Sequence, residues 1–200
     1  MNDPKLIVFV KAPRPGAVKT RLAESVGAPA ACAAYRHLVE TLLHQLQTLT
    51  AVELRFSPDD AAREIQDWLI GGWTCSPQGA GDLGKRLQSA FQCAFKAGAK
   101  RVVIIGSDCP AVRAGDIRDA WNSLLEHDVV LGPASDGGYW LIGLRRPRPH
   151  LLENIPWSTE RVFAETLTRI HRSGLSAQLL RELTDVDTET QWRQFLASKS

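Results

Sequence analysis

Runs of apolar residues alternate with amphipathic segments along the chain. Residues 6–10 and 102–105 are uninterrupted apolar runs, mostly β-branched, which predicts strands buried on both faces, as in a parallel α/β sheet. Over residues 29–49 and 87–95, apolar side chains recur every three or four positions, which predicts amphipathic helices. The pattern therefore predicts an α/β fold with 102–105 as its central strand.

Further strands are expected at 51–56, 73–75, 128–133 and 139–144 and within 175–183, and further helices at 58–69, 117–126, 158–173 and 188–195. Only residues 134–138 separate two of these strands, too few for a helical crossover, so we expect an antiparallel pair and a mixed sheet. Ser158 is a candidate helix cap, and Thr188 with Gln191 forms a candidate capping box.

Asp108 directly follows the central strand, and Pro110 ends the ladder. In open α/β sheets, ligands bind beyond the carboxyl ends of the strands, so Asp108 is the first functional candidate. The alternative is an aspartate that only caps the helix beginning near Ala114.

Composition narrows the class of protein. Two hundred residues favour one domain, 1–200, and 24 Lys and Arg against 22 Asp and Glu give no electrostatic reason to expect a nucleic acid or a membrane as partner. The start of the chain resembles no signal peptide. Four scattered cysteines fit reduced core thiols better than disulfides or a zinc site, which favours a cytoplasmic protein: Cys32, Cys75, Cys93 and Cys109.

The loop after the first strand has the composition of a phosphate-binding loop. Its cations are Lys11, Arg14, Lys19 and Arg21, and Gly16 permits close backbone approach. Gly16 stands three residues before Lys19, so the loop is not a P-loop. The alternative is a solvated basic loop.

Two more segments carry candidate chemistry. Residues 78–86 hold three glycines that permit either a backbone wall against a flat ligand or a flexible turn capped by Asp82. Asp185 and Asp187 share one side of an extended segment and suit a hard divalent cation, in a region grouped with Asp136 and its turn.

Six motifs carry a resemblance that spans nearly the whole chain: FVKAPRPGAVKTRLA, QGAGDLGKRL, IIGSDCPAV, VLGPASDGGYWLIGL, IPWS and DVDT. In order and spacing they resemble the DUF2064 family of glycosyltransferase A (GT-A)-like proteins, in the nucleotide-diphospho-sugar transferase superfamily. The first loop and DVDT are also similar to 2-phospholactate guanylyltransferases and, more distantly, to molybdenum-cofactor guanylyltransferases. The resemblance implies a Rossmann-like three-layer αβα fold with a mixed, mostly parallel sheet, and a transferase that uses Mg²⁺ or Mn²⁺.

The resemblance also implies roles for individual residues. Asp108 and Asp187 would hold the metal, and Asp136 would lie near the acceptor. The nucleotide would be bound by Lys11, Arg14, Gly16, Lys19, Arg21, Gln78, Gly81, Asp82, Gly84 and Arg86. The chain departs from GT-A enzymes in having a single carboxylate at Asp108-Cys109-Pro110 instead of Asp-x-Asp, and from pyrophosphorylases in lacking G-x-G-x-R.

The leading hypothesis is nucleotidyl transfer from a nucleoside triphosphate onto a small phosphorylated acceptor, with Lys19, Arg14 and Asp136 as catalytic residues. Glycosyl transfer from a nucleotide sugar is the first alternative. A non-catalytic nucleotide-binding module is the second.

Overall fold

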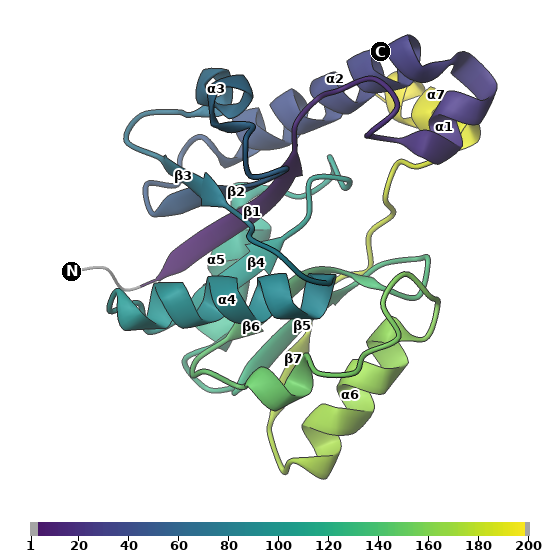
Figure 1. Ribbon diagram of the computed structural model, residues 1–200. Helices are drawn as coiled ribbons and strands as arrows, with labels where there is room; N and C mark the ends of the chain where they lie inside the picture. The colour runs from purple at the N-terminus through teal and green to yellow at the C-terminus, as the bar shows by residue number, and fades with distance from the viewer. Residues whose placement is uncertain (1–3, 199–200) are drawn as a thin grey trace.

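One seven-stranded sheet forms the centre of the computed structural model, which describes residues 4–198 (Figure 1). Its strands are β1 (Lys5–Lys11), β2 (Val52–Ser57), β3 (Thr74–Pro77), β4 (Val102–Ile105), β5 (Val129–Pro133), β6 (Tyr139–Leu144) and β7 (Ala177–Leu179). Their order is β3-β2-β1-β4-β6-β5-β7, with β6 antiparallel to both neighbours and every other pair parallel. The predicted central strand and antiparallel insertion are confirmed.

Helices cover both faces of the sheet. They are α1 (Thr20–Val26), α2 (Ala28–Leu46), α3 (Ala62–Ile65), the 3₁₀ turn η1 (Gln66–Trp68), α4 (Leu83–Lys96), α5 (Ala114–Ser123), the 3₁₀ turn η2 (Pro149–Leu151), α6 (Val162–Arg172) and α7 (Glu189–Ala197). Among the described residues, no helix combines the length and apolar character needed to cross a membrane.

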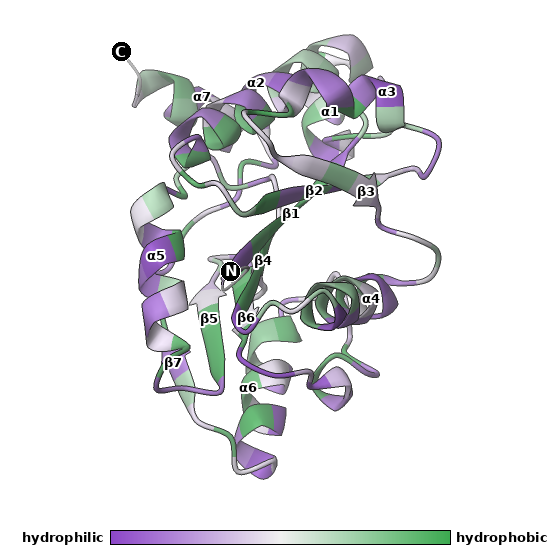
Figure 2. Ribbon diagram, turned by 90° about the vertical axis from the view of Figure 1, so that its left-hand side faces the viewer, coloured by the Kyte–Doolittle hydropathy of each residue, from purple (hydrophilic) through white to green (hydrophobic). Residues whose placement is uncertain are grey.

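Alternation along each strand divides the core between the two faces. On β1, Leu6 and Val8 belong to the cluster that α2 and α5 cover, while Ile7 and Phe9 belong to the cluster that α4 and α6 cover. The central strands are accordingly hydrophobic throughout (Figure 2). The fold is therefore the expected three-layer αβα arrangement.

Two short helices, α1 and α7, pack together on α2 (Figure 1). Leu22 of α1 and Trp192 of α7 join one cluster with alanines of α2, and Trp192 also meets His37 edge-to-face with ring centroids 5.9 Å apart. This packing brings the segments that precede α1 and α7 to the same end of the sheet.

Several predicted boundaries are wrong for local reasons. The helix expected at 58–69 starts only at Ala62, because the preceding residues form a turn whose Asp59 carboxylate accepts a hydrogen bond from Gly79 N. Ser158 is not a cap: it has φ of 62°, and α6 begins four residues later. The capping box of Thr188 and Gln191 is confirmed.

All four cysteines are free, as expected, but only Cys32 and Cys109 are buried. Cys93 is exposed and Cys75 is half-buried, so the description as core thiols holds for two of the four.

Candidate active site

An open cavity of about 990 Å³ lies beyond the carboxyl ends of β1 and β4. That size fits a nucleotide-sized ligand. The predicted site residues that line it are Lys11, Lys19, Arg21, Gln78, Gly81, Asp82, Arg86, Asp108, Asp136 and Asp187. Segments far apart in the sequence therefore meet in one place.

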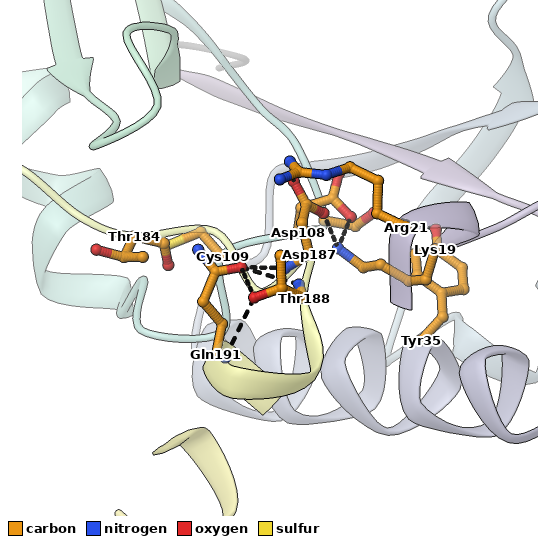
Figure 3. A network of polar contacts seen from close by, with 10 residues as sticks. Lys19, Arg21, Tyr35, Asp108, Cys109, Thr184, Asp187, Thr188 and Gln191 are labelled. Carbon is orange, nitrogen blue, oxygen red and sulfur yellow. Dashed lines mark hydrogen bonds and ion pairs between the residues drawn. The ribbon is translucent and has the colours of Figure 1, made fainter. Parts of the chain in front are cut away.

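Lys19 lines the cavity and joins two carboxylates in a network of polar contacts (Figure 3). Its side chain is 2% exposed, and its ammonium is ion-paired with Asp108 and, at 2.9 Å, with Oδ1 of Asp187. Burial alone lowers the pKa of Lys19, but the two carboxylates outweigh it and raise the pKa. Lys19 is thus a buried, charged residue, which corrects the alternative of a solvated basic loop at this position.

Main-chain hydrogen bonds hold the two aspartates in place. Val186 N donates to Asp108 O at 2.9 Å, which ties the C-terminal segment to the turn after β4. Gln191 Oε1 accepts from the backbone N–H groups of Asp187 and Thr188, both at 2.9 Å, within the capping box of α7. Helix capping therefore positions Asp187 beside Asp108.

Asp108 does not cap α5. The N-cap of that helix is Arg113, and the carboxylate of Asp116 accepts a hydrogen bond from Arg113 N at 2.8 Å. The alternative explanation of Asp108 as a helix cap is wrong.

Tyr35 is a site residue that sequence patterns do not reveal. Its hydroxyl accepts from Lys11 N at 2.7 Å and lies 3.0 Å from Ser107 Oγ, so it joins the end of β1 to the end of β4. Burial raises the pKa of Tyr35. The only sequence signal is a tyrosine on the apolar face of α2, which also fits a plain core residue.

Negative charge accumulates next to Lys19. Asp185 is half-buried, and its pKa is raised to about 7 by burial and by the neighbouring carboxylates of Asp108, Asp187 and Asp136. A carboxyl group with such a perturbed pKa in a cavity is typical of a functional site.

The 78–86 segment builds another wall. Gln78 is buried, donates to Val10 O at 3.1 Å and to Arg55 O at 3.0 Å, and accepts from Arg86 Nη1 at 3.3 Å. Asp82 caps α4 by accepting from Lys85 N. Gln78 is thus committed to positioning Arg86, which lines the cavity.

Three predicted site residues lie outside the cavity lining. The Arg14 guanidinium binds Glu64 Oε1 at 2.6 Å and Asp60 Oδ1 at 3.1 Å. Gly16, with φ of 82°, forms an open turn. A Cβ on Gly84 would lie 2.5 Å from Leu152 O and 2.7 Å from Trp157 Nε1, so this glycine permits close packing. The geometry gives none of the three a contact with a ligand in this cavity.

The donor set suits a hard divalent cation bound together with phosphates. No group of three or more His, Cys, Asp or Glu side chains within residues 4–198 is arranged to hold a metal. Mg²⁺ typically takes one or two protein carboxylates and completes its shell with phosphate oxygens and water. Asp108 and Asp187 meet that requirement, provided Lys19 yields one of its contacts.

Comparison with known proteins identifies relatives. Phosphoenolpyruvate guanylyltransferase of Chloroflexus aggregans is 30% identical over 128 residues, 62% of this chain and 61% of that protein. The match thus spans about three fifths of the relative's length. A crystal structure from Desulfovibrio desulfuricans G20, assigned as a nucleotide-diphospho-sugar transferase, is 38% identical with a TM-score of 0.88 and covers 94% of this chain and 84% of that chain.

More distant structures share the fold alone. CMP:2-keto-3-deoxy-manno-octonic acid synthetase complexed with CTP has a TM-score of 0.60 at 12% identity, over 99% of this chain and all (100%) of that one. Rv0371C of Mycobacterium tuberculosis H37Rv in complex with manganese has a TM-score of 0.56 at 14% identity, over 99% of this chain and 100% of the other.

The model of the family described as "Uncharacterized protein conserved in bacteria (DUF2064)" matches residues 41–159. That segment covers more than half of the chain and includes β4 with Asp108 as well as Asp136. The chain therefore belongs to the DUF2064 family.

Proposed function

We propose that the chain is a divalent-metal-dependent nucleotidyltransferase that uses a nucleoside triphosphate and a small acceptor. The observation that carries the proposal is the buried Lys19 ammonium between Asp108 and Asp187 at the carboxyl end of β4. Opposite charges that meet in a cavity supply what a metal–phosphate complex needs: carboxylates for the cation and cations for the phosphates.

The cations near the cavity would differ in how they contact the nucleotide. Lys11, Arg21 and Arg86 line the cavity and would pair with phosphate oxygens. Lys19 would exchange a carboxylate for a phosphate oxygen when the nucleotide arrives. Arg14 contributes indirectly at most, because Glu64 and Asp60 already hold its guanidinium.

Asp108 and Asp187 would hold Mg²⁺ or Mn²⁺. When bound, that ion neutralises charge on the phosphate oxygens during transfer. Asp185 lies among the carboxylates of Asp108, Asp187 and Asp136, and a cation bound there would relieve their mutual repulsion.

The relatives support nucleotidyl chemistry. The Chloroflexus aggregans protein is named a guanylyltransferase, and the structural neighbour with CTP is named a synthetase of a CMP compound. The manganese complex of Rv0371C supports a divalent cation on this fold.

Glycosyl transfer from a nucleotide sugar is the second candidate. It is favoured by the Desulfovibrio desulfuricans structure. It is also favoured by aromatic and hydroxyl side chains that line the cavity, including Tyr139, Trp157 and Thr159. A non-catalytic module is disfavoured, because a chain without chemistry has no reason to accept the desolvation cost of Lys19 and Asp185.

The test is direct. The protein is incubated with each nucleoside triphosphate, Mg²⁺ or Mn²⁺ and a panel of acceptors, and pyrophosphate is measured. Metal-dependent pyrophosphate release supports nucleotidyl transfer. Release of nucleoside diphosphate from nucleotide sugars would replace it with glycosyl transfer, and binding without either product would leave the module.

A further inference from the structure

The cations that line the cavity come from one half of it, together with the carboxylates of Asp82, Asp108, Asp185 and Asp187. These cations are Lys11, Lys19, Arg21 and Arg86, from the end of β1, the loop after it, the start of α1 and the first turn of α4. The opposite half is built by residues 136–142 and 157–162. Among the described lining residues, that half contributes the carboxylates of Asp136 and Glu160 and no Lys, Arg or His.

This acidic half is a packed wall. Phe163 N donates to Gly137 O at 2.9 Å, which joins the start of α6 to the turn between β5 and β6. Tyr139 and Trp157 pack edge-to-face with ring centroids 6.3 Å apart and planes at 82°. Trp157 in turn packs on Gly84, where a Cβ would come within 2.7 Å of its Nε1. Contacts between residues 136–142 and the start of α6, and between Trp157 and α4, therefore hold this wall in place.

The side chains of this wall have a definite recognition chemistry. Carboxylates accept hydrogen bonds from hydroxyl groups, Ser158 supplies a hydroxyl, and Trp157 offers an aromatic surface to an apolar face. The Thr159 hydroxyl is already engaged, because it donates to Pro156 O at 2.7 Å and accepts from Arg161 N at 3.3 Å. A phosphate or carboxylate placed here would face Asp136 and Glu160 with no paired cation, which like-charge repulsion disfavours.

We propose that the acceptor is an uncharged, polyhydroxylated molecule, a sugar or polyol, bound by the acidic wall of Asp136, Trp157, Ser158, Thr159 and Glu160. This inference rests on the proposed function for its donor and replaces the phosphorylated acceptor that the sequence led us to expect.

A hydroxyl nucleophile needs a base, and Asp136 is placed to provide one. Its Oδ1 accepts from Gly138 N at 2.9 Å, which fixes the carboxylate in a turn that lines the cavity. The acceptor O–H gives its proton to Asp136 as its oxygen forms a bond to the α-phosphorus. The bond from that phosphorus to the bridging oxygen breaks, and pyrophosphate leaves with the electron pair.

The experiment compares matched acceptors in direct binding. Saturation-transfer NMR is recorded on the protein with Mg²⁺ and a non-hydrolysable nucleoside triphosphate, using hexoses and inositols against their own phosphate monoesters. The expected result is binding of neutral compounds at least about tenfold tighter than binding of the monoesters, the discrimination that about 1.4 kcal/mol gives.

A charge-reversal variant sharpens the test. Glu160→Lys should shift the preference toward the monoesters by about tenfold or more, whereas Glu182→Lys, an exposed control outside the cavity lining, should leave it unchanged.

Tighter binding of the monoesters by the unaltered protein would overturn the inference, as would failure of every neutral compound to bind while the nucleotide binds. Calorimetry with nucleotide and Mg²⁺ alone keeps the two proposals apart. If the nucleotide binds and pyrophosphate appears only with anionic acceptors, the donor assignment stands and the acceptor inference fails.

Discussion

The Lys19 ammonium lies 2.9 Å from Oδ1 of Asp187 and is also ion-paired with Asp108, so one cation of the chain joins the two carboxylates proposed as metal ligands. A divalent cation and this ammonium would compete for the same oxygens. The nucleotide resolves the competition in our proposal, because its phosphates offer Lys19 another anionic partner. Metal and nucleotide should therefore bind with positive coupling.

Lys19→Met tests this competition. Removing the ammonium frees both carboxylates, so Mn²⁺ affinity of the nucleotide-free protein should rise severalfold while nucleotide affinity falls about tenfold or more. Calorimetry with Mn²⁺ alone and then with nucleotide measures both. Lys96→Met, on the exposed side of α4, is the control and should change neither. A lysine that only contacts phosphates would leave the affinity for Mn²⁺ alone unaltered.

The same variant should also be less stable. Lys19 is buried and paired, so its loss leaves Asp108 and Asp187 facing each other, at a cost of about 1–3 kcal/mol. A fall in the midpoint of thermal unfolding by several degrees is expected. Unchanged stability would mean that the ammonium is solvated in solution.

The variant Asp108→Asn distinguishes a role in metal binding from a role in stability. The amide cannot match a carboxylate as a metal ligand, so metal-dependent nucleotide binding and turnover should be lost, while unfolding free energy drops by only about 1 kcal/mol because Asp187 still pairs with Lys19. Asp116→Asn gives the opposite pattern. The Asp116 carboxylate accepts from the backbone N–H of the α5 N-cap, Arg113, and pairs with Arg181 Nε at 2.7 Å, so its loss should lower stability and leave metal-dependent binding intact. Metal-dependent turnover by Asp108→Asn would contradict the proposal that Asp108 holds the metal.

Arginine substitutions test which loop cations reach the nucleotide. Arg21 is exposed at the cavity, with Nη1 4.0 Å from Asp187 Oδ2, whereas Arg14 is held by Glu64 and Asp60. Arg21→Met should weaken nucleotide binding about tenfold, and Arg14→Met should leave it within about twofold. Titration calorimetry of the two variants decides. The reverse ranking would restore the role that the sequence predicts for Arg14.

The strands and the helix caps at Asp82 and Thr188 were predictable because their signals are local, whereas the cap predicted at Ser158 was not found. The four β-branched residues before Gly106 predict a buried strand from their own pattern, without reference to distant segments. Thr188 and Gln191 form a capping box from residues only three positions apart. The position of Asp108 followed, since a strand's carboxyl end in an open α/β sheet faces the ligand.

The ion-pair partners of Arg14 and Lys19 could not be predicted from the sequence. Both are cations of one loop, yet Arg14 pairs with Glu64, 50 residues away, and Lys19 with Asp187, 168 residues away. Composition cannot choose such partners, because the choice depends on how α3 and the C-terminal segment pack. The role of Gly84 also depends on how distant segments pack. The sequence placed it in a nucleotide-binding loop, whereas in the structure its small size permits close packing against Trp157.

Asp185 gives the chain a distinctive pH dependence. Burial and the carboxylates of Asp108, Asp187 and Asp136 raise its pKa to about 7 in the folded protein, well above that of an unfolded aspartate. The folded state therefore holds this proton more tightly than the unfolded state. Its stabilising contribution is fully present below about pH 4 and is lost as the pH rises toward 7, by an amount on the order of 2–4 kcal/mol.

Asp185→Asn should remove that loss. With a chelator present, the unfolding free energy of the variant minus that of the unaltered protein should grow between about pH 4 and pH 7.5. Only the unaltered protein must ionise a half-buried carboxyl group that lies among other carboxylates. Urea denaturation at a series of pH values measures the difference, and Asp119→Asn, an exposed aspartate of α5, supplies the control with a flat difference. A flat difference for Asp185→Asn as well would show that Asp185 ionises in the folded protein as readily as in water, and that the carboxylates around Lys19 repel one another too weakly to favour a cation.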